Sequence, residues 1–348
     1  MNGRTRKLRA SARVPVFMEI AQALVLSSAA RPDQPWASVR STPKPLVPVA
    51  NRPLLFHDLD ALRAAGVRET TIAVEPGTAG VIRDAVGDGE DWRMTVRYAE
   101  CAPHAPVAEA LARSRDLMAH EPVLVRRAGT VLREGIHPHI AAFADERLDA
   151  LALRTPGLPD GDRPGAPHDG SMMLSRRAVS ILTDGASDHD PLARIAAGGG
   201  HVRVQEVDGC LPCLGRQDSL LEANRRVLAE LTPSVAAEAL LDSRVQGPVV
   251  IHPTAHVERS LVRGPAIIGP RARIVDSYVG PSTSIGADVE LEGAEVEYSI
   301  VLPGARLAFL GRRLEASVIG RGAQVRRSLT PPASLRLAVG EGAEIVLS

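Results

Sequence analysis

A six-residue spacing of aliphatic side chains in the carboxyl-terminal part of the chain constrains the fold more than any other feature. Five segments have an aliphatic residue followed by another six positions later, and they begin at Ile251, Ile268, Ile285, Val301 and Ile319. Their starting points are 17, 17, 16 and 18 residues apart. This hexapeptide register is typical of a parallel β-helix, in which each coil has three short strands. A β-sandwich does not keep such a register over five coils.

The register also predicts which side chains line the interior of the β-helix. One side chain per strand points inward, so we expect Ile251, Ile268, Ile285 and Val301 to stack in a single column. A further repeat, serine followed two positions later by Val or Ile, occurs at Ser260, Ser277, Ser299 and Ser317. We expect the β-helix to occupy residues 249–348, after a linker at residues 232–248.

Residues 20–231 have a different pattern, in which short apolar runs alternate with helical periodicity. Strands are expected at residues 23–26, 69–74, 94–98 and 123–126, and helices at residues 54–65, 79–86, 107–118 and from residue 138 onward. This alternation predicts an α/β domain with a doubly wound parallel sheet. Such sheets bind ligands beyond the carboxyl ends of their strands. The loops after Leu26, Tyr98 and Arg126 therefore form the candidate site.

The first residues of the chain resemble a signal peptide only superficially. Residues 1–13 carry five basic side chains and no acidic one, but Glu19 and Gln22 interrupt the apolar stretch that follows. Residues 1–19 are expected to be a disordered or spurious extension. Met1 and Met18 both remain candidate start positions.

Composition excludes several classes of function. The 348-residue chain has 41 Lys and Arg against 41 Asp and Glu, so it lacks the basic excess of a nucleic-acid-binding protein. Its 2 Trp, 3 Tyr and 4 Phe are too few for a base-stacking platform. It has no run of 18 apolar residues, so we expect no membrane partner. Three cysteines fit a reducing compartment and a cytoplasmic location.

Several motifs resemble those of the sugar-1-phosphate nucleotidylyltransferases. They are Ala23-Leu-Val-Leu-Ser27, Lys44-Pro-Leu-Val-Pro-Val-Ala-Asn-Arg-Pro53, Leu220-Leu-Glu-Ala-Asn-Arg-Arg-Val-Leu228 and Gly280-Pro-Ser-Thr-Ser-Ile-Gly286. The chain is most similar to the long glucose-1-phosphate thymidylyltransferase type. That resemblance implies a Rossmann-like nucleotidyltransferase domain followed by a left-handed β-helix. It also implies a reaction in which a nucleoside triphosphate and a sugar-1-phosphate give a nucleotide sugar and pyrophosphate.

The resemblance fails at most positions that would carry this chemistry. The family has a glycine-rich phosphate loop where this chain reads Ser28-Ala-Ala-Arg-Pro-Asp-Gln34, and Pro32 has no backbone N–H. The two aspartates that hold Mg²⁺ in the family correspond here to Gly129 and Cys213. Glycine offers no ligand, and a thiol is a poor ligand for Mg²⁺. We therefore expect no catalytic residue and no metal site.

Two residues remain as remnants of substrate contacts. Lys44 falls on a phosphate-contact position of the family, and Gly170 is what remains of a strand that contacts the sugar. Pro106 replaces a glycine at the position where the nucleobase approaches. We predict that any nucleotide or sugar-phosphate ligand binds weakly.

Other candidate motifs have ordinary explanations. Cys210 and Cys213 form a C-x-x-C pair with no second pair to complete a zinc site. The pairs His137/His139 and His252/His256 are too small for a zinc site and are expected to be solvated. His252 and His256 keep a minor alternative open, a hexapeptide-repeat acyltransferase.

These observations leave two main hypotheses. The first is a catalytically degenerate family member with a structural or regulatory role, forming a homo-oligomer or a hetero-oligomer with an active paralogue. The second is an active thymidylyltransferase-like enzyme that uses Mg²⁺ through displaced ligands at Asp91, Asp160 or Asp162.

Overall fold

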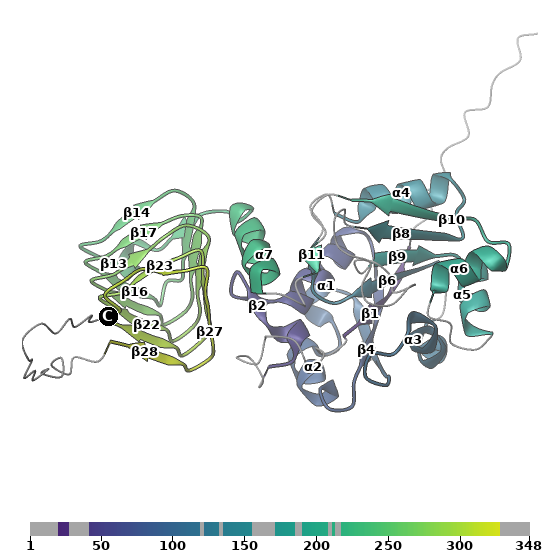
Figure 1. Ribbon diagram of the computed structural model, residues 1–348, viewed down its shortest axis with the longest axis horizontal. Coiled ribbons are helices and arrows are strands. Elements are labelled where there is room, and N and C mark those ends of the chain that lie inside the picture. The colour runs from purple at the N-terminus through teal and green to yellow at the C-terminus, as the bar shows by residue number, and fades with distance from the viewer. Residues whose placement is uncertain are drawn as a thin grey trace, which may run out of the picture.

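The computed structural model describes residues 20–27, 42–118, 122–131, 135–154, 171–184, 190–207, 211–212 and 217–327. An α/β domain and a β-helix lie side by side along the long axis of the molecule, with one helix between them (Figure 1). Within the described residues, the model contains no helix with the length and apolar character needed to cross a membrane.

The α/β domain is built on a seven-stranded sheet with the order β10-β8-β9-β6-β1-β4-β5. Its strands are β1 (Gln22–Leu26), β4 (Glu69–Val74), β5 (Thr95–Glu100), β6 (Val123–Arg127), β8 (Ala150–Arg154), β9 (Ser171–Leu174) and β10 (Val202–Glu206). The four expected strands are confirmed within two residues. The sheet is mixed rather than fully parallel, because β9 runs antiparallel to both β6 and β8. The sequence pattern assigned no element between the fourth helix and residue 231, so it gave no direction for this strand.

Helices cover both faces of the sheet, as the alternation of strands and helices predicts. Side chains of α1 (Leu54–Ala64), α2 (Ala79–Val86) and α4 (His137–Asp145) share one apolar core with the sheet. Side chains of α3 (Val107–Arg113), α5 (Arg176–Thr183) and α6 (Pro191–Ala197) form the core on the other face. Side chains of β1 alternate between the two cores: Ala23 and Val25 belong to the first, and Leu24 and Leu26 to the second.

The described residues also include four short 3₁₀ helices: η2 (Lys44–Leu46), η3 (Glu90–Trp92), η4 (Arg115–Leu117) and η6 (Ala237–Ala239).

Two small strand pairs and one helix lie outside the main sheet. The strands β2 (Pro48–Val49) and β3 (Arg52–Pro53) form a hairpin, and β7 (Thr130–Val131) pairs antiparallel with β11 (Leu211–Pro212). Helix α7 (Gln217–Ala229) follows and contacts both β2 and the β-helix. These elements join the two halves of the molecule.

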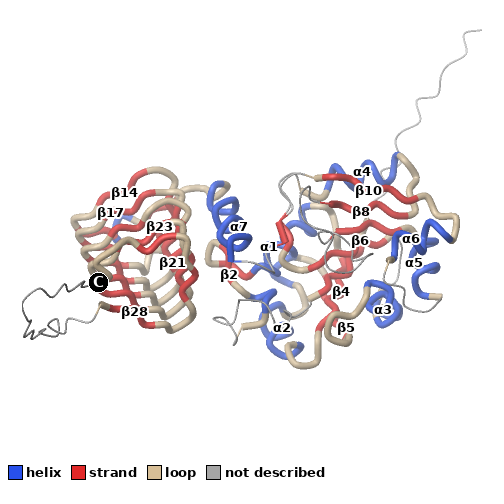
Figure 2. The backbone as a smooth tube through the Cα atoms, in the orientation of Figure 1, coloured by secondary structure: helices blue, strands red, loops and turns tan. Residues whose placement is uncertain are grey.

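The carboxyl-terminal half is a parallel β-helix with three walls (Figure 2). The first wall consists of β12 (Ser234–Val235), β15 (Val249–Ile251), β18 (Ala266–Ile268), β21 (Thr283–Ile285), β24 (Ile300–Val301) and β27 (Val318–Ile319). The second consists of β13 (Leu240–Leu241), β16 (His256–Glu258), β19 (Arg273–Val275), β22 (Glu290–Glu292), β25 (Arg306–Ala308) and β28 (Gln324–Arg326). The third consists of β14 (Arg244–Gln246), β17 (Leu261–Arg263), β20 (Tyr278–Val279), β23 (Glu295–Glu297) and β26 (Leu314–Glu315).

The predicted interior column is confirmed. Ile251, Ile268, Ile285 and Val301 are register partners on successive strands of the first wall. Each is at most 2% exposed. The six-residue spacing therefore identified the inward-facing positions correctly, since a slip of one residue would have turned this column outward.

The β-helix begins before the expected linker ends, so that expectation is wrong for residues 234–246. Strands β12, β13 and β14 pair in register with β15, β16 and β17 and make up a first coil. The register partner of Ile251 is Val235, and that of Val257 is Leu240. Val235 and Leu240 are five residues apart in the first coil, whereas Ile251 and Val257 are six residues apart in the next. A six-residue pattern therefore does not find the first coil.

The repeated serines form two separate columns of hydrogen bonds. At one corner the Ser260 hydroxyl accepts a bond from the Ser277 amide at 3.0 Å, and the Ser277 hydroxyl accepts one from the Ala294 amide at 3.2 Å. At another corner the Ser299 hydroxyl accepts a bond from the Ser317 amide at 3.1 Å. Ser260, Ser277 and Ser299 thus each tie their own coil to the next and satisfy backbone groups at the corners.

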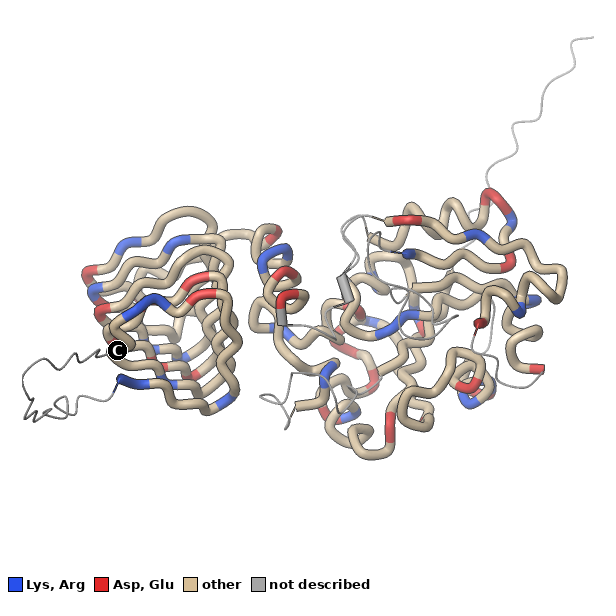
Figure 3. The backbone as a smooth tube through the Cα atoms, in the orientation of Figure 1, with Lys and Arg blue, Asp and Glu red and all other residues tan. Residues whose placement is uncertain are grey.

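Charged side chains also pair between neighbouring coils. Figure 3 shows acidic and basic residues alternating along one edge of the β-helix. Arg259 forms two bonds of 2.8 Å to Asp276, and Arg271 forms two of 2.7 Å to Asp288. These side chains are about half exposed, so each pair contributes little to stability.

Candidate functional site

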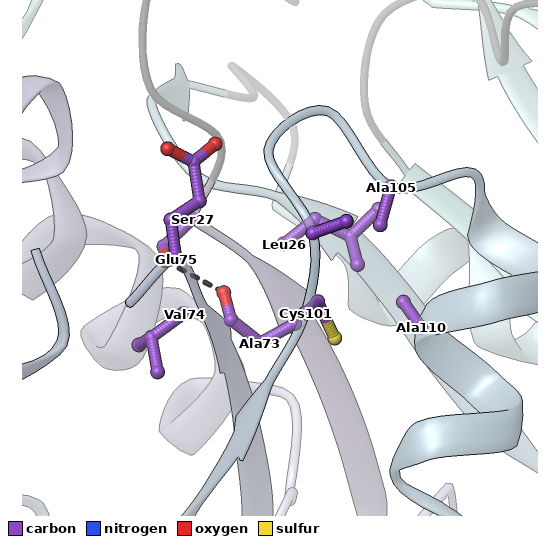
Figure 4. A pocket seen from close by; sticks show the side chains of 9 residues that line it. Leu26, Ser27, Ala73, Val74, Glu75, Cys101, Ala105 and Ala110 are labelled. Atoms are coloured by element: carbon purple, nitrogen blue, oxygen red, sulfur yellow. Dashed lines mark hydrogen bonds between the residues drawn. The ribbon is translucent and has the colours of Figure 1, made fainter. Parts of the chain in front are cut away.

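A small pocket opens beyond the carboxyl ends of β1, β4 and β5, where ligands of such sheets bind (Figure 4). Its empty volume, including the open solvent at its mouth, is about 230 Å³, and it is lined by Leu26, Ser27, Ala73, Val74, Glu75, Cys101, Ala102, Ala105 and Ala110. Most of these side chains are small and apolar, and none of the described lining residues is basic. The pocket lies where the sequence places the candidate site, but the described part of its wall offers no positive charge to a phosphate.

The polar side chains Ser27 and Glu75 of this pocket already form hydrogen bonds within the protein. The Ser27 hydroxyl donates to the Ala73 carbonyl at 2.6 Å, and the His104 amide donates to Glu75 Oε1 at 3.4 Å. In Figure 4 the Glu75 carboxyl group points away from the apolar side chains of the wall. Burial, followed by the nearby Glu109 carboxylate, raises the pKa of the Cys101 thiol. The thiol is therefore protonated near neutral pH and is a weak nucleophile.

The end of β6 holds a buried ion pair that the sequence interpretation missed. Asp58 on α1 and Arg126 on β6 are each 1% exposed, and Arg126 Nε donates to Asp58 Oδ1 at 2.5 Å. The Arg126 guanidinium also donates through Nη2 to the Thr130 carbonyl. Burial raises the pKa of Asp58, whereas Arg126 and the Gly129 amide lower it. An arginine at the end of an apolar strand, and an aspartate on the apolar face of a helix, were the signals for this pair.

Gly129 lies directly against this ion pair. Its amide donates to Asp58 Oδ2 at 2.7 Å, so the two oxygens of one carboxylate bind Arg126 and Gly129. Gly129 has φ +86°, a conformation that glycine adopts readily and an L-residue rarely does. The turn after β6 thus has the positive φ that favours glycine at residue 129, where the family resemblance expects an aspartate.

The two segments expected to carry metal ligands run beside each other. Thr130 on β7 is the register partner of Pro212 on β11. Gly129 precedes Thr130 in the chain and Cys213 follows Pro212, although Cys213 itself lies outside the described residues. This topology is the one that the resemblance implies, with different residues at the ligand positions.

The residues of this site do not fit Mg²⁺. Gly129 has no side-chain oxygen, and the carboxylate beside it already binds the Arg126 guanidinium. A hard divalent cation prefers several carboxylate or carbonyl oxygens, and a neighbouring guanidinium repels it. Across the described segments, no group of three or more His, Cys, Asp or Glu side chains is placed to bind a metal ion.

The other predicted residues are distributed as follows. Lys44 begins η2 and is half-buried, with its carbonyl accepting a bond from the Val47 amide. Gly170, Asp160, Asp162 and Cys210 lie outside the described residues. Asp91 is exposed in η3, four residues before β5 begins, and therefore lies at the amino end of that strand. The expectation that Asp91 replaces a metal ligand at the carboxyl edge is wrong.

The histidine pairs are not brought together into a larger cluster within the described ranges. His139 is buried in α4, so the expectation that this pair is solvated is wrong for His139, whereas His137 is exposed at the start of the same helix. His252 Nδ1 lies 2.9 Å from the Thr254 hydroxyl, and His256 Nε2 lies 3.1 Å from Glu258 Oε2. Both partners are two residues away in the sequence. These are local contacts of exposed side chains.

Comparison with known proteins gives matches to the α/β domain and to most of the chain. A family model described as nucleotidyl transferase matches residues 38–157. The glucose-1-phosphate thymidylyltransferase of Streptomyces griseus is 31% identical over 336 residues, covering 88% of this chain and 94% of the relative. The enzyme of the same name from Streptomyces antibioticus is 29% identical over 333 residues, covering 87% and 93%.

The matched domain and the observed fold first define a class, a nucleotidyl transferase domain joined to a β-helix. The chain belongs to the sugar-1-phosphate nucleotidyltransferase family. Among solved structures, one described as a glucose-1-phosphate thymidylyltransferase from Bacillus anthracis in complex with sucrose overlaps 62% of this chain and 97% of its own. Its TM-score is 0.49 and its sequence identity 15%.

Proposed function

We propose that this chain is a catalytically degenerate member of its family with a structural or regulatory role in sugar-nucleotide metabolism. One observation supports the proposal above the others. The Arg126 guanidinium and the Gly129 amide occupy both oxygens of the buried Asp58 carboxylate, at the edge of the sheet where a nucleotidyltransferase binds its metal. A guanidinium fixed in this place repels a divalent cation and already binds the carboxylate that could hold one.

Phosphoryl transfer depends on the devices that this chain lacks. The reaction needs positioned reactants and cations that neutralise the charge developing on the phosphates. Arg126 is 1% exposed and pairs with Asp58, so its charge is largely compensated. Arg126 Nη1 has no hydrogen-bond partner in the described structure. This Nη1 group is buried and the charge of Arg126 is compensated, so it cannot supply the charge neutralisation that turnover needs.

An active thymidylyltransferase-like enzyme is the second candidate. The 31% identity with the Streptomyces griseus enzyme over 88% of the chain favours it. Under this alternative, the residues outside the described ranges would have to supply the metal ligands.

A pyrophosphate-release assay decides between the two candidates. The purified chain is incubated with Mg²⁺, each of the common nucleoside triphosphates and a panel of sugar-1-phosphates that includes glucose-1-phosphate. The Streptomyces griseus relative is assayed beside it with thymidine triphosphate as the positive control. We expect no pyrophosphate above the blank from this chain. Turnover within about a hundredfold of the relative, a loss of about 3 kcal/mol of transition-state stabilisation, would contradict the proposal.

A regulatory role requires a partner on which the chain acts. We propose a homo-oligomer, or a hetero-oligomer with an active paralogue whose activity this chain modulates through a subunit interface. A chain that catalyses no reaction itself can change the rate of a partner's reaction only by binding the active and inactive states of that partner with different affinity.

A further inference from the structure

Asn224 lies where the two halves of the molecule meet. It belongs to α7, which both views place beside β2, between the β-helix and the main sheet of the α/β domain (Figures 1 and 2). The side chain is fully buried, at 0% exposure. The surrounding cluster is apolar and draws on the hairpin segment, α1, α7 and the β-helix: Val47, Val49, Leu54, Leu220, Leu221, Ala223, Ile300 and Leu302.

The amide group of Asn224 binds both halves at once. Its Oδ1 accepts a bond from the Ala50 amide at 2.9 Å and one from the Ser284 hydroxyl at 2.6 Å. Its Nδ2 donates to the Ser282 carbonyl at 3.1 Å. Ala50 is in the hairpin of the α/β domain, whereas Ser282 and Ser284 are in the fourth coil of the β-helix.

A second asparagine makes a direct bond across the junction. Asn51 Nδ2 donates to the Ile285 carbonyl at 2.7 Å. Ala50 and Asn51 form the tip of the hairpin with φ +47° and +61°. Asparagine tolerates this left-handed conformation better than most residues, so Asn51 both shapes the turn and supplies the bond. The two neighbouring tip residues thus bind the hairpin to its surroundings, Ala50 to α7 through Asn224 and Asn51 directly to the β-helix.

A buried amide in an apolar cluster favours one arrangement over all others. Apolar surfaces can slide past each other with a small change in free energy, but an unpaired buried amide is costly. The bonds of Asn224 are satisfied only when the hairpin, α7 and this coil are in their present register. In coiled coils a single buried asparagine selects register in the same way.

We propose that Asn224 is a positioning residue that locks the α/β domain and the β-helix into one rigid unit, and that the hairpin at residues 48–53 is the docking element. The motif at residues 44–53, which resembles a phosphate-contact segment, therefore has a second role in joining the two halves. This proposal does not depend on whether the chain is catalytic. This docking also couples the two halves, because a ligand or partner that displaces the hairpin must weaken the contact between the hairpin and the β-helix.

Hydrogen exchange of the full chain tests the proposal at the Ala50 amide. Asn224→Leu keeps a similar volume but removes all three bonds, and Asn51→Gly keeps the positive φ while removing the bond to Ile285. We expect Asn224→Leu to raise exchange at residue 50 roughly 10-fold or more, and Asn51→Gly to raise it at least about threefold. The rise should appear at residues 48–53 and 282–286 while the central strands β1 and β6 keep their protection. A merely destabilising change would instead raise exchange in those strands as well.

Ala50→Gly is the matched control. It changes the same turn, relieves the positive φ of Ala50 and retains the amide that binds Asn224. Its exchange at residue 50 should stay close to that of the unmodified chain. If Asn224→Leu does not fold, Asn51→Gly alone decides the question. Unchanged local exchange in Asn51→Gly, or equal increases throughout the α/β domain, would overturn the proposal.

Discussion

At the scale of single residues, the site is defined by a carboxylate that binds a guanidinium and a backbone amide. A buried carboxylate without partners would be protonated or very unfavourable, so Asp58 and Arg126 depend on each other. The pair also links α1 to the end of β6 and to the turn at Gly129. It therefore holds these three segments of the candidate site together.

Removing Arg126 should make stability depend strongly on pH. Burial raises the folded-state pKa of Asp58, and Arg126 is the largest influence that lowers it. An acid with a raised folded-state pKa stabilises the fold fully at low pH, and that contribution is lost as pH rises. Arg126→Met should cost about 3–5 kcal/mol in total, with a larger loss at about pH 8 than at about pH 4. Urea unfolding at both pH values measures this, with the double variant Asp58→Asn/Arg126→Met as control. The double variant should lose the pH dependence; if it does not, Asp58 is not the titrating group.

Restoring an aspartate at residue 129 should not create a metal site. The φ of +86° is strained for an L-residue, and a second carboxylate would lie beside Asp58. We expect Gly129→Asp to lower the free energy of unfolding by about 1–3 kcal/mol and to bind no stoichiometric Mg²⁺ in calorimetry. Gly135→Asp serves as a control, since it also has positive φ but open space around it. Tight Mg²⁺ binding by Gly129→Asp would show that one carboxylate suffices to rebuild the site.

At the scale of elements, the coils of the β-helix depend on the inward columns. Ile268 is 1% exposed and lies between Ile251 and Ile285. Ile268→Asp places an unpaired charge in this column and should destabilise the fold by several kcal/mol, roughly 3 or more. Thermal unfolding followed by circular dichroism measures the effect. Arg273→Asp, on the exposed side of β19 in the same coil, should change the melting temperature little. Equal effects of the two substitutions would contradict the assigned register.

The same elements show what the sequence can predict and where it stops. Strands β1, β4, β5 and β6 and the interior column follow from local periodicity, because each residue's environment is set by its neighbours in the chain. The first coil was missed because Val235 and Leu240, the register partners of Ile251 and Val257, are five residues apart rather than six. The pair Asp58–Arg126 spans 68 residues of sequence, and no local pattern connects its members. The direction of β9 likewise depends on pairing with β6 and β8.

At the scale of the whole molecule, the strand edges at the amino-terminal end of the β-helix bear on assembly. In the described structure β12 pairs only with β15, and β13 only with β16. Val235 and Leu241 on these edge strands are 40% and 51% exposed. Open strand edges and apolar side chains of this kind favour association with another chain unless they are covered. The net charge of zero adds no long-range repulsion between copies.

We therefore expect this protein to associate in solution, with itself or with an active member of its family. Light scattering at micromolar concentration, on the chain alone and mixed with an active paralogue, measures the mass of each species. Leu241→Glu places a charge on the exposed edge, far from the pair at Asp58, and should weaken self-association without changing the fold. A mixed species should also change the paralogue's rate of pyrophosphate release, because binding that distinguishes the active state shifts its population. A strict monomer that neither binds the paralogue nor alters its rate would remove the regulatory role and leave a chain with neither catalysis nor a partner.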